Sequence, residues 1–129
     1  MLPLCQDQGI GVIPFSPLAR GWLARKPSLE QNETLRAKTD ALIKQRYDRA
    51  DNLAIVQRVS EVAEAHGLPM AQIALAWMLS KPVVTAPIIG ATKPHHLEDA
   101  IASLSVQLTP EEIQRLEEPY QPHPIIGFS

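Results

Sequence analysis

Apolar residues recur every three to four positions over much of the chain, and this spacing predicts amphipathic helices. The clearest example runs from Asp51 to His66, where Asp51 opens the helix and His66 with Gly67 supplies a stop. Its apolar stripe consists of Ile55, Val56, Val59, Val62 and Ala63. The charged residues of the segment fall mostly off that stripe, so we expect one buried face and one solvated face.

Three further helices are predicted towards the C-terminal end. The segment Pro69 to Ser80 is apolar nearly all round, so we expect a helix wedged between neighbours, with Pro69 in its first turn. Helical spacing returns at Leu97, Ala100, Ile101 and Leu104. The sequence from Thr109 to Glu112 is typical of a capping box with proline at the first helical position, and it predicts a helix from Pro110 to about Glu118.

Two short runs that are apolar at nearly every position predict parallel strands buried on both faces. The first is Gly9 to Phe15 and the second is Val83 to Ile89. Pro87 must lie near the end of the second strand or on a side where no ladder donor is required. Ahead of the first run, Met1 to Gln8 is typical of the last turns of a helix that ends at Gly9. The polar stretch Lys26 to Thr34 predicts a surface loop.

The order strand, helices, strand, helices predicts an α/β fold in which a long right-handed crossover joins two parallel strands. Two such strands leave both outer edges unpaired, whereas a complete (β/α)8 TIM barrel takes roughly 250 residues. The 129 residues therefore predict a single piece (residues 1–129) of a larger architecture, either an incomplete barrel or an open sheet.

Composition adds few constraints. With 45% apolar and 20% charged residues the chain suits a folded core, and a net charge of -2 gives no basic field, so we do not expect nucleic acid as a partner. The longest apolar stretch, Ile73 to Leu79, is far below the roughly 20 residues that cross a bilayer, and the N-terminus lacks a signal-peptide pattern. We expect a cytoplasmic protein without a membrane partner. The single Cys5 has no partner for an internal disulfide, and no Cys/His set has metal-binding spacing.

Candidate chemistry follows the first strand, at the edge where parallel β/α proteins place ligands. In the first loop, Phe15 to Gly21, the Ser16 hydroxyl and nearby backbone N–H groups suit phosphate oxygens. Arg20 adds positive charge, and Phe15 offers a flat face to an aromatic ring. The alternative is an ordinary turn with a core phenylalanine and a solvated arginine.

The second loop, Gly90 to His96, follows the other strand and leads into a helix. Gly90 allows a close backbone approach, the helix N-terminus presents unpaired N–H groups, and Lys93 with a histidine neutralises an anion. The alternative is that Thr92 is only an N-cap, Pro94 only a first-turn residue, and both histidines exposed. Two such loops after neighbouring strands favour a phosphate site, because the last two strands of TIM barrels commonly build one.

The chain resembles the end of the aldo-keto reductase barrel over essentially its whole length. The resemblance implies that Gly9 to Phe15 is the seventh barrel strand and Val83 to Ile89 the eighth. The tail from Glu118 to Phe128 resembles most the bacterial YajO-like branch, related to potassium-channel β-subunits. The segments that carry the family resemblance, in order and spacing, are Gly11 to Gly21, Ala74 to Trp77, Pro87 to Leu97 and Leu108 to Glu112.

The resemblance also implies an NADP(H) site. Phe15 takes the place of an aromatic residue that stacks on nicotinamide, although the family usually has tryptophan or tyrosine there. The residues at pyrophosphate positions are Ser16, Pro17, Leu18 and Arg20. Those at adenosine 2′-phosphate positions are Gly90, Thr92, Lys93 and His96. Asp99 falls where the family contacts adenine, while Ala100 replaces a common asparagine. Positive charge at the 2′-phosphate position favours NADP(H) over NAD(H).

Members of this family are oxidoreductases that reduce aldehydes or ketones by hydride transfer from the nicotinamide, with a tyrosine acid assisted by lysine, aspartate and histidine. These four residues belong to earlier strands, and neither Tyr47 nor Tyr120 lies in a matching motif, so no catalytic residue is assigned.

We expect a C-terminal fragment that is inactive by itself and prone to self-association. The full-length protein is expected to take a small carbonyl substrate, with Pro119 to Ser129 at its pocket rim. The alternatives are a non-catalytic nucleotide-binding or regulatory remnant, and a phosphate-binding piece of an unrelated barrel enzyme.

Overall fold

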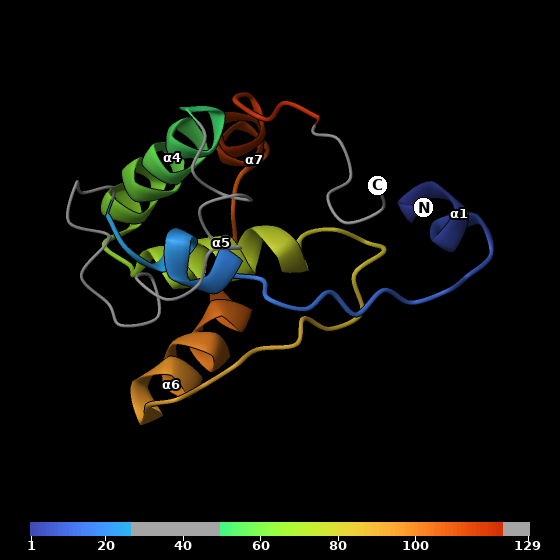
Figure 1. Ribbon diagram of the computed structural model, residues 1–129, viewed down its shortest axis with the longest axis horizontal. Helices are drawn as coiled ribbons and strands as arrows, with labels where there is room; N and C mark the ends of the chain where they lie inside the picture. Colours follow the sequence, from blue (N-terminus) through green and yellow to red (C-terminus); the bar gives the residue numbers. More distant parts are fainter. Residues whose placement is uncertain (27–49, 123–129) are drawn as a thin grey trace, which may run out of the picture.

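The computed structural model describes residues 1–26 and 50–122, and within them the chain is mainly helical (Figure 1). Most of the predicted loop from Lys26 to Thr34 lies outside the described residues. None of the helices in the described part is both long and apolar enough to cross a membrane. In chain order, the helical elements are α1 (Leu2–Asp7), the 3-10 helix η1 (Ala19–Ala24), α4 (Ala50–His66), α5 (Met70–Leu79), α6 (Pro94–Ala102), the 3-10 helix η3 (Ser103–Ser105) and α7 (Pro110–Glu117).

The predicted helix ends are confirmed where local signals were present. At the end of α4 the backbone N–H groups of Gly67 and Leu68 donate to the carbonyls of Glu64 and Ala63, at 3.1 and 3.0 Å. This pair of bonds is a Schellman motif, and Gly67 supplies the left-handed residue it needs with φ +64°. At the start of α7 the predicted capping box is present, since Thr109 and Glu112 each accept from the other's backbone N–H.

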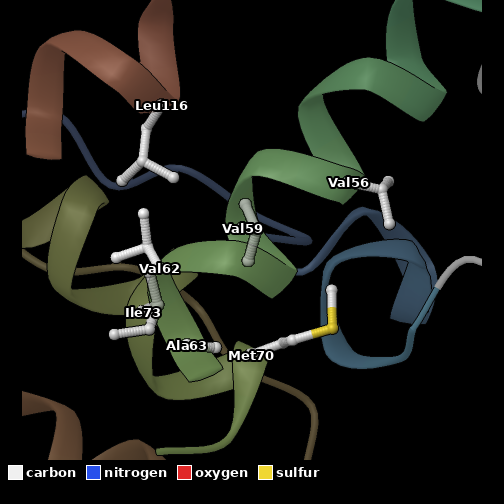
Figure 2. Packing of buried hydrophobic residues seen from close by; sticks show 7 residues of the cluster. All are labelled: Val56, Val59, Val62, Ala63, Met70, Ile73 and Leu116. Carbon is white, nitrogen blue, oxygen red and sulfur yellow. The ribbon is translucent and has the colours of Figure 1, made fainter. Parts of the chain in front are cut away.

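Helix α5 lies at the centre of the packing, as its apolar sequence predicts. It contacts α4, α6, η1 and η3, while α7 packs on α4 (Figure 1). Figure 2 shows the core between these helices, in which Ile73 of α5 is 0% exposed. The residues of this cluster are Val56, Val59, Val62, Ala63, Met70, Ile73 and Leu116. Each fully buried aliphatic side chain contributes roughly 1.5–3 kcal/mol, so these contacts hold the helices together.

The two predicted strand segments lie side by side and run parallel. They are joined by two isolated bridges, between Val12 and Val84 and between Phe15 and Ile88. The Ile88 N–H donates to the Pro14 carbonyl at 2.8 Å, and the Thr85 N–H donates to the Val12 carbonyl at 2.9 Å. A regular parallel ladder would take its next donor two residues after Thr85, at Pro87, which has no N–H, and Ile88 donates instead. The predicted parallel neighbours are thus present, although the described residues form bridges rather than an extended sheet.

The prediction that both strands are buried on both faces is wrong for this chain. Ile13 is 61% exposed, Phe15 74% and Ile88 53%. The apolar stripe predicted for the helix after the second strand is also exposed, with Ile101 at 59% and Leu104 at 71%. The physical reason is that an apolar pattern specifies which side chains can be buried, whereas actual burial requires a covering layer. Within the described residues, no layer covers the exposed apolar faces of the strand pair and of α6.

Candidate functional site

The parallel pairing brings the two candidate loops to the same end of the strand segments. Phe15 pairs with Ile88, so Ser16 follows one residue beyond this bridge and Gly90 two residues beyond it. In parallel β/α proteins this carboxyl end is where ligands bind. The two candidate loops therefore begin at the same edge of the strand pair.

Both loops are also supported by the same helix. The first loop runs into η1 and the second into α6, and each of these elements packs against α5 (Figure 1). Because α5 is anchored in the core through buried Ile73, it provides a rigid support for the two flanking segments. Rigid helices hold binding groups more precisely than unsupported loops do.

The first loop has an unusual backbone. Ser16, Ala19 and Arg20 have φ values of 56°, 47° and 57°, in the left-handed region that side chains other than glycine rarely occupy. A bond from the Ala19 N–H to the Ser16 carbonyl at 2.9 Å closes the turn, and Pro17 beneath it is buried. Strained backbone of this kind is concentrated at ligand-binding and catalytic segments of proteins.

Phe15, at the start of this loop, carries its ring on the surface. Its side chain is 74% exposed within the described residues. Leu18 is half-buried and Arg20 is exposed. The loop therefore presents an aromatic face and a guanidinium group outside the core.

The second loop orients a histidine. The Thr92 N–H donates to Nδ1 of His96 at 3.4 Å, and an Nδ1 that accepts leaves the ring proton on Nε2. His96 is half-buried, whereas His95, whose ring meets it edge to face at 4.5 Å, is exposed. The expectation that both histidines are exposed is thus wrong for His96. Gly90 borders open space, since an added Cβ there meets no atom within 4 Å.

The N-terminus of α6 has no side-chain cap. The N-cap is Lys93 rather than Thr92, so the alternative that makes Thr92 the cap is wrong, while Pro94 occupies the first helical position as expected. Pro94 has no N–H, and the His96 N–H donates to the Lys93 carbonyl at 3.1 Å, so few N–H groups of the first turn remain free. The charge of Lys93 adds to the positive end of the helix. The positive end of the helix and the Lys93 charge together favour binding of an anion.

One residue that the sequence reasoning missed is connected to this site. Nε2 of Gln72, in α5, donates to Oδ1 of Asp99, in α6, at 2.9 Å. Gln72 is only 7% exposed. A polar residue in a helix that is otherwise apolar was the available signal, but its partner is 27 positions away and no local pattern identifies it.

The described donor set fits a phosphorylated ligand with an aromatic group. Backbone N–H groups, the Ser16 hydroxyl and the cations Arg20 and Lys93 suit phosphate oxygens, and the exposed Phe15 ring suits a planar heterocycle. Titratable groups with shifted pKa values lie elsewhere, on α4 and α7. There the Lys81 ammonium holds the pKa of Glu117 below its usual value, and Arg58 does the same for Glu61.

Comparisons with known proteins identify the family of the chain. The model of the "Aldo/keto reductase family" matches residues 1–121. Versiconal hemiacetal acetate reductase from Aspergillus parasiticus is 47% identical, over 97% of this chain and 36% of that protein. A putative aryl-alcohol dehydrogenase of Schizosaccharomyces pombe, C750.01, is 46% identical, over 98% of this chain and 38% of that protein. The chain therefore spans somewhat more than a third of the length of these relatives.

Among solved structures, the fold is similar to that of a thermostable aldo-keto reductase, Tm1743, determined in complex with the inhibitor epalrestat. The TM-score is 0.62 at 26% identity, and the match covers 92% of this chain and 33% of that one. The two relatives above are fungal, so the bacterial YajO-like branch that the tail indicated is corrected to a fungal type. Residues 123–128 of that tail lie outside the described part.

Proposed function

Since the chain belongs to the aldo/keto reductase family, whose members reduce carbonyl compounds with NAD(P)H, we propose that it forms the NADP(H)-binding part of such a reductase. The observation that carries the proposal is the parallel bridge between Phe15 and Ile88, because it brings both candidate loops to one edge. A dinucleotide is long enough to contact both. Either loop alone is also compatible with an ordinary turn.

The two paired segments correspond in this proposal to the seventh and eighth strands of a TIM barrel. Their parallel direction supports the assignment, as does the exposure of apolar side chains that a complete barrel covers. The match to about a third of a solved aldo-keto reductase is consistent with a partial barrel.

Each loop has a separate part in the proposed site. In the first, the exposed ring of Phe15 stacks on the nicotinamide, and the pyrophosphate is lined by Ser16, Pro17, Leu18 and Arg20. In the second, the adenosine 2′-phosphate is held by Gly90, Thr92, Lys93 and His96, and adenine meets Asp99. Bound NADPH supplies a hydride to the carbonyl carbon of the substrate. The residues of this chain hold and orient the dinucleotide.

Preference for NADP(H) over NAD(H) follows from the charges of the second loop. Lys93 is exposed at the uncapped end of α6, and the proton on Nε2 of His96 is available for a phosphate oxygen. Only the 2′-phosphate of NADP(H) provides a dianion for these groups, since NAD(H) has a hydroxyl there.

Reduction of a small aldehyde or ketone is proposed for the whole protein, and the 129-residue chain alone is proposed to be inactive. None of its residues matches the family's tyrosine, lysine, aspartate and histidine set. The same observation favours a second candidate, a nucleotide-binding module without turnover. The two share the cofactor site, and tight NADPH binding by the isolated chain would favour the binding module.

The test is a titration of the purified chain with NADPH and with NADH, followed by nicotinamide fluorescence. We expect NADPH to bind at least tenfold more tightly. Lys93→Gln should weaken NADPH about tenfold, as expected for loss of a charged hydrogen bond, and should leave NADH nearly unchanged. The control is Arg115→Gln, which removes the same charge from α7, a helix packed on α4. Equal affinity for both cofactors, or equal effects of the two substitutions, contradicts the proposal.

A further inference from the structure

The side-chain amide of Gln72 is buried, although the packing of α5 requires no polar group at this position. It is 7% exposed, and its neighbours Ile73, Ala74 and Leu75 in α5 are all buried apolar residues. A buried amide without a partner destabilises a protein, and methionine fills nearly the same volume without that cost. The partner is Asp99 of α6, whose Oδ1 accepts from Nε2 of Gln72 at 2.9 Å.

The half-buried face of α6 carries polar residues beside Ala100, which belongs to the predicted apolar stripe. His96, Asp99 and Ala100 are half-buried and Ser103, which follows in η3, is 2% exposed, all at helical spacing. The apolar stripe lies on another side, where Leu97 and Ile101 are 51% and 59% exposed. Helix α6 packs against α5 (Figure 1), so a polar side-chain contact between them constrains how α6 is rotated about its axis. The Gln72–Asp99 bond is a direct side-chain link between the two helices.

The geometry points to Gln72 as a positioning residue that aims the Asp99 carboxylate at the adenine of the cofactor, an inference that rests on the proposed function. The bond from Gln72 uses Oδ1, so Oδ2 can accept a second hydrogen bond. An ionised carboxylate only accepts, and the exocyclic amino group of adenine is a donor. Gln72 fixes the plane of the carboxylate, and it acts on adenine only through Asp99.

The hydrogen bond between Gln72 and Asp99 also affects the orientation of His96. It lies three residues before Asp99 on the same face of α6, so fixing the rotation of the helix at Asp99 also fixes the direction of the His96 ring. Gln72 thus contributes to both the adenine and the phosphate ends of the proposed site, although it belongs to neither loop.

The experiment compares NADPH with its deamino analogue, in which hypoxanthine replaces adenine and the amino group is absent. Fluorescence titrations of the 129-residue chain are carried out for the wild type, Gln72→Met and the matched control Gln57→Met, at an exposed glutamine of α4. We expect the wild type to prefer NADPH. Gln72→Met should lose about 3- to 10-fold in NADPH affinity, as for one hydrogen bond, with a much smaller loss for the analogue. The control should change neither.

Asp99→Asn separates recognition from folding. Asparagine keeps an oxygen that accepts from Gln72 but replaces the second carboxylate oxygen with an amide donor. We expect an unchanged denaturation midpoint and loss of the preference for NADPH over the analogue. If Gln72→Met fails to fold, this variant still tests whether the Asp99 carboxylate recognises adenine.

Three results overturn the inference, and they are distinguishable. If Gln72→Met weakens both cofactors equally, Gln72 is only structural. If Asp99→Asn retains the preference for NADPH, adenine is recognised elsewhere. If the wild-type chain binds neither dinucleotide, the proposed function fails, and the role of Gln72 fails with it.

Discussion

At the scale of single residues, Glu112 has the densest set of interactions in the described part of α7. Its Oε2 accepts from the Thr109 backbone N–H at 2.8 Å, and its Oε1 lies 2.7 Å from Nε2 of His66 at the end of α4. The Thr109 N–H holds the pKa of the Glu112 carboxyl below its usual value, and His66 adds to this, while partial burial opposes it. One side chain therefore both caps α7 and joins it to α4.

The charge of Glu112 should make stability depend on pH in the acid range. Its pKa is lower in the folded state than the usual 4.5, so the ionised form stabilises the fold above pH 4.5, and this contribution is lost as the pH falls through the lowered pKa. Glu112→Gln keeps an acceptor for the capping box but removes the charge. We expect its free energy of unfolding to be about 1 kcal/mol below that of the wild type at pH 7, with the difference shrinking as the pH falls below 4.5 and through the lowered pKa. Urea denaturation at a series of pH values measures this.

Glu111→Gln is the matched control for this change. Glu111 is exposed in the same first turn of α7, so it shares the interaction with the helix dipole and lacks the two contacts. A smaller effect than that of Glu112→Gln is expected. Equal effects at pH 7 would show that the contacts with Thr109 and His66 contribute nothing beyond the dipole.

The capping box could be predicted at this scale, and the contacts between distant residues could not. Thr109 and Glu112 are three residues apart, so their spacing identifies them. The partners in the bonds His66–Glu112, Gln72–Asp99 and Trp77–Glu117 are 46, 27 and 40 residues apart. Sequence periodicity shows which face of a helix is buried, but it does not show which residues of two packed helices meet.

At the scale of elements, the helices and the pairing of the strands were predictable, and the burial of the strands was not. Caps and apolar stripes define α4, α5 and α7 locally, and the continuous apolar runs indicated parallel strands that are indeed neighbours. Close approach of these strands depends on Gly11. An added Cβ there lies 2.2 Å from Oγ1 of Thr85 in the other strand, which is far inside van der Waals contact.

Gly11→Ala should therefore loosen the strand pair, and Thr85→Ala should rescue it by removing the clashing atom. The readout is hydrogen exchange of the Thr85 amide, which donates to the Val12 carbonyl. We expect Gly11→Ala to speed this exchange about tenfold or more, in line with the usual cost of overpacking. The double variant should return close to the rate of Thr85→Ala alone. If the two effects are simply additive, the close contact between Gly11 and Thr85 does not exist.

At the scale of the whole molecule, burial is distributed unevenly. The core lies between α4, α5 and α7, whereas the large exposed apolar side chains are concentrated in α1, the strand pair and the segment from α6 to η3. Exposed apolar surface of this kind favours association, which supports the expectation that the isolated chain self-associates. The candidate loops lie at the end of the less protected part, where the described residues connect them through the backbone pairing and through α5.

The most direct test of the account is whether both loops bind the same molecule. Amide resonances of the 129-residue chain are followed by NMR during a titration with NADPH. We expect the amides of the first loop, Phe15 to Gly21, and of the second, Gly90 to His96, to shift together with a single dissociation constant, while those of α7 stay in place. A response from only one loop, or two clearly different constants, would contradict a shared dinucleotide site.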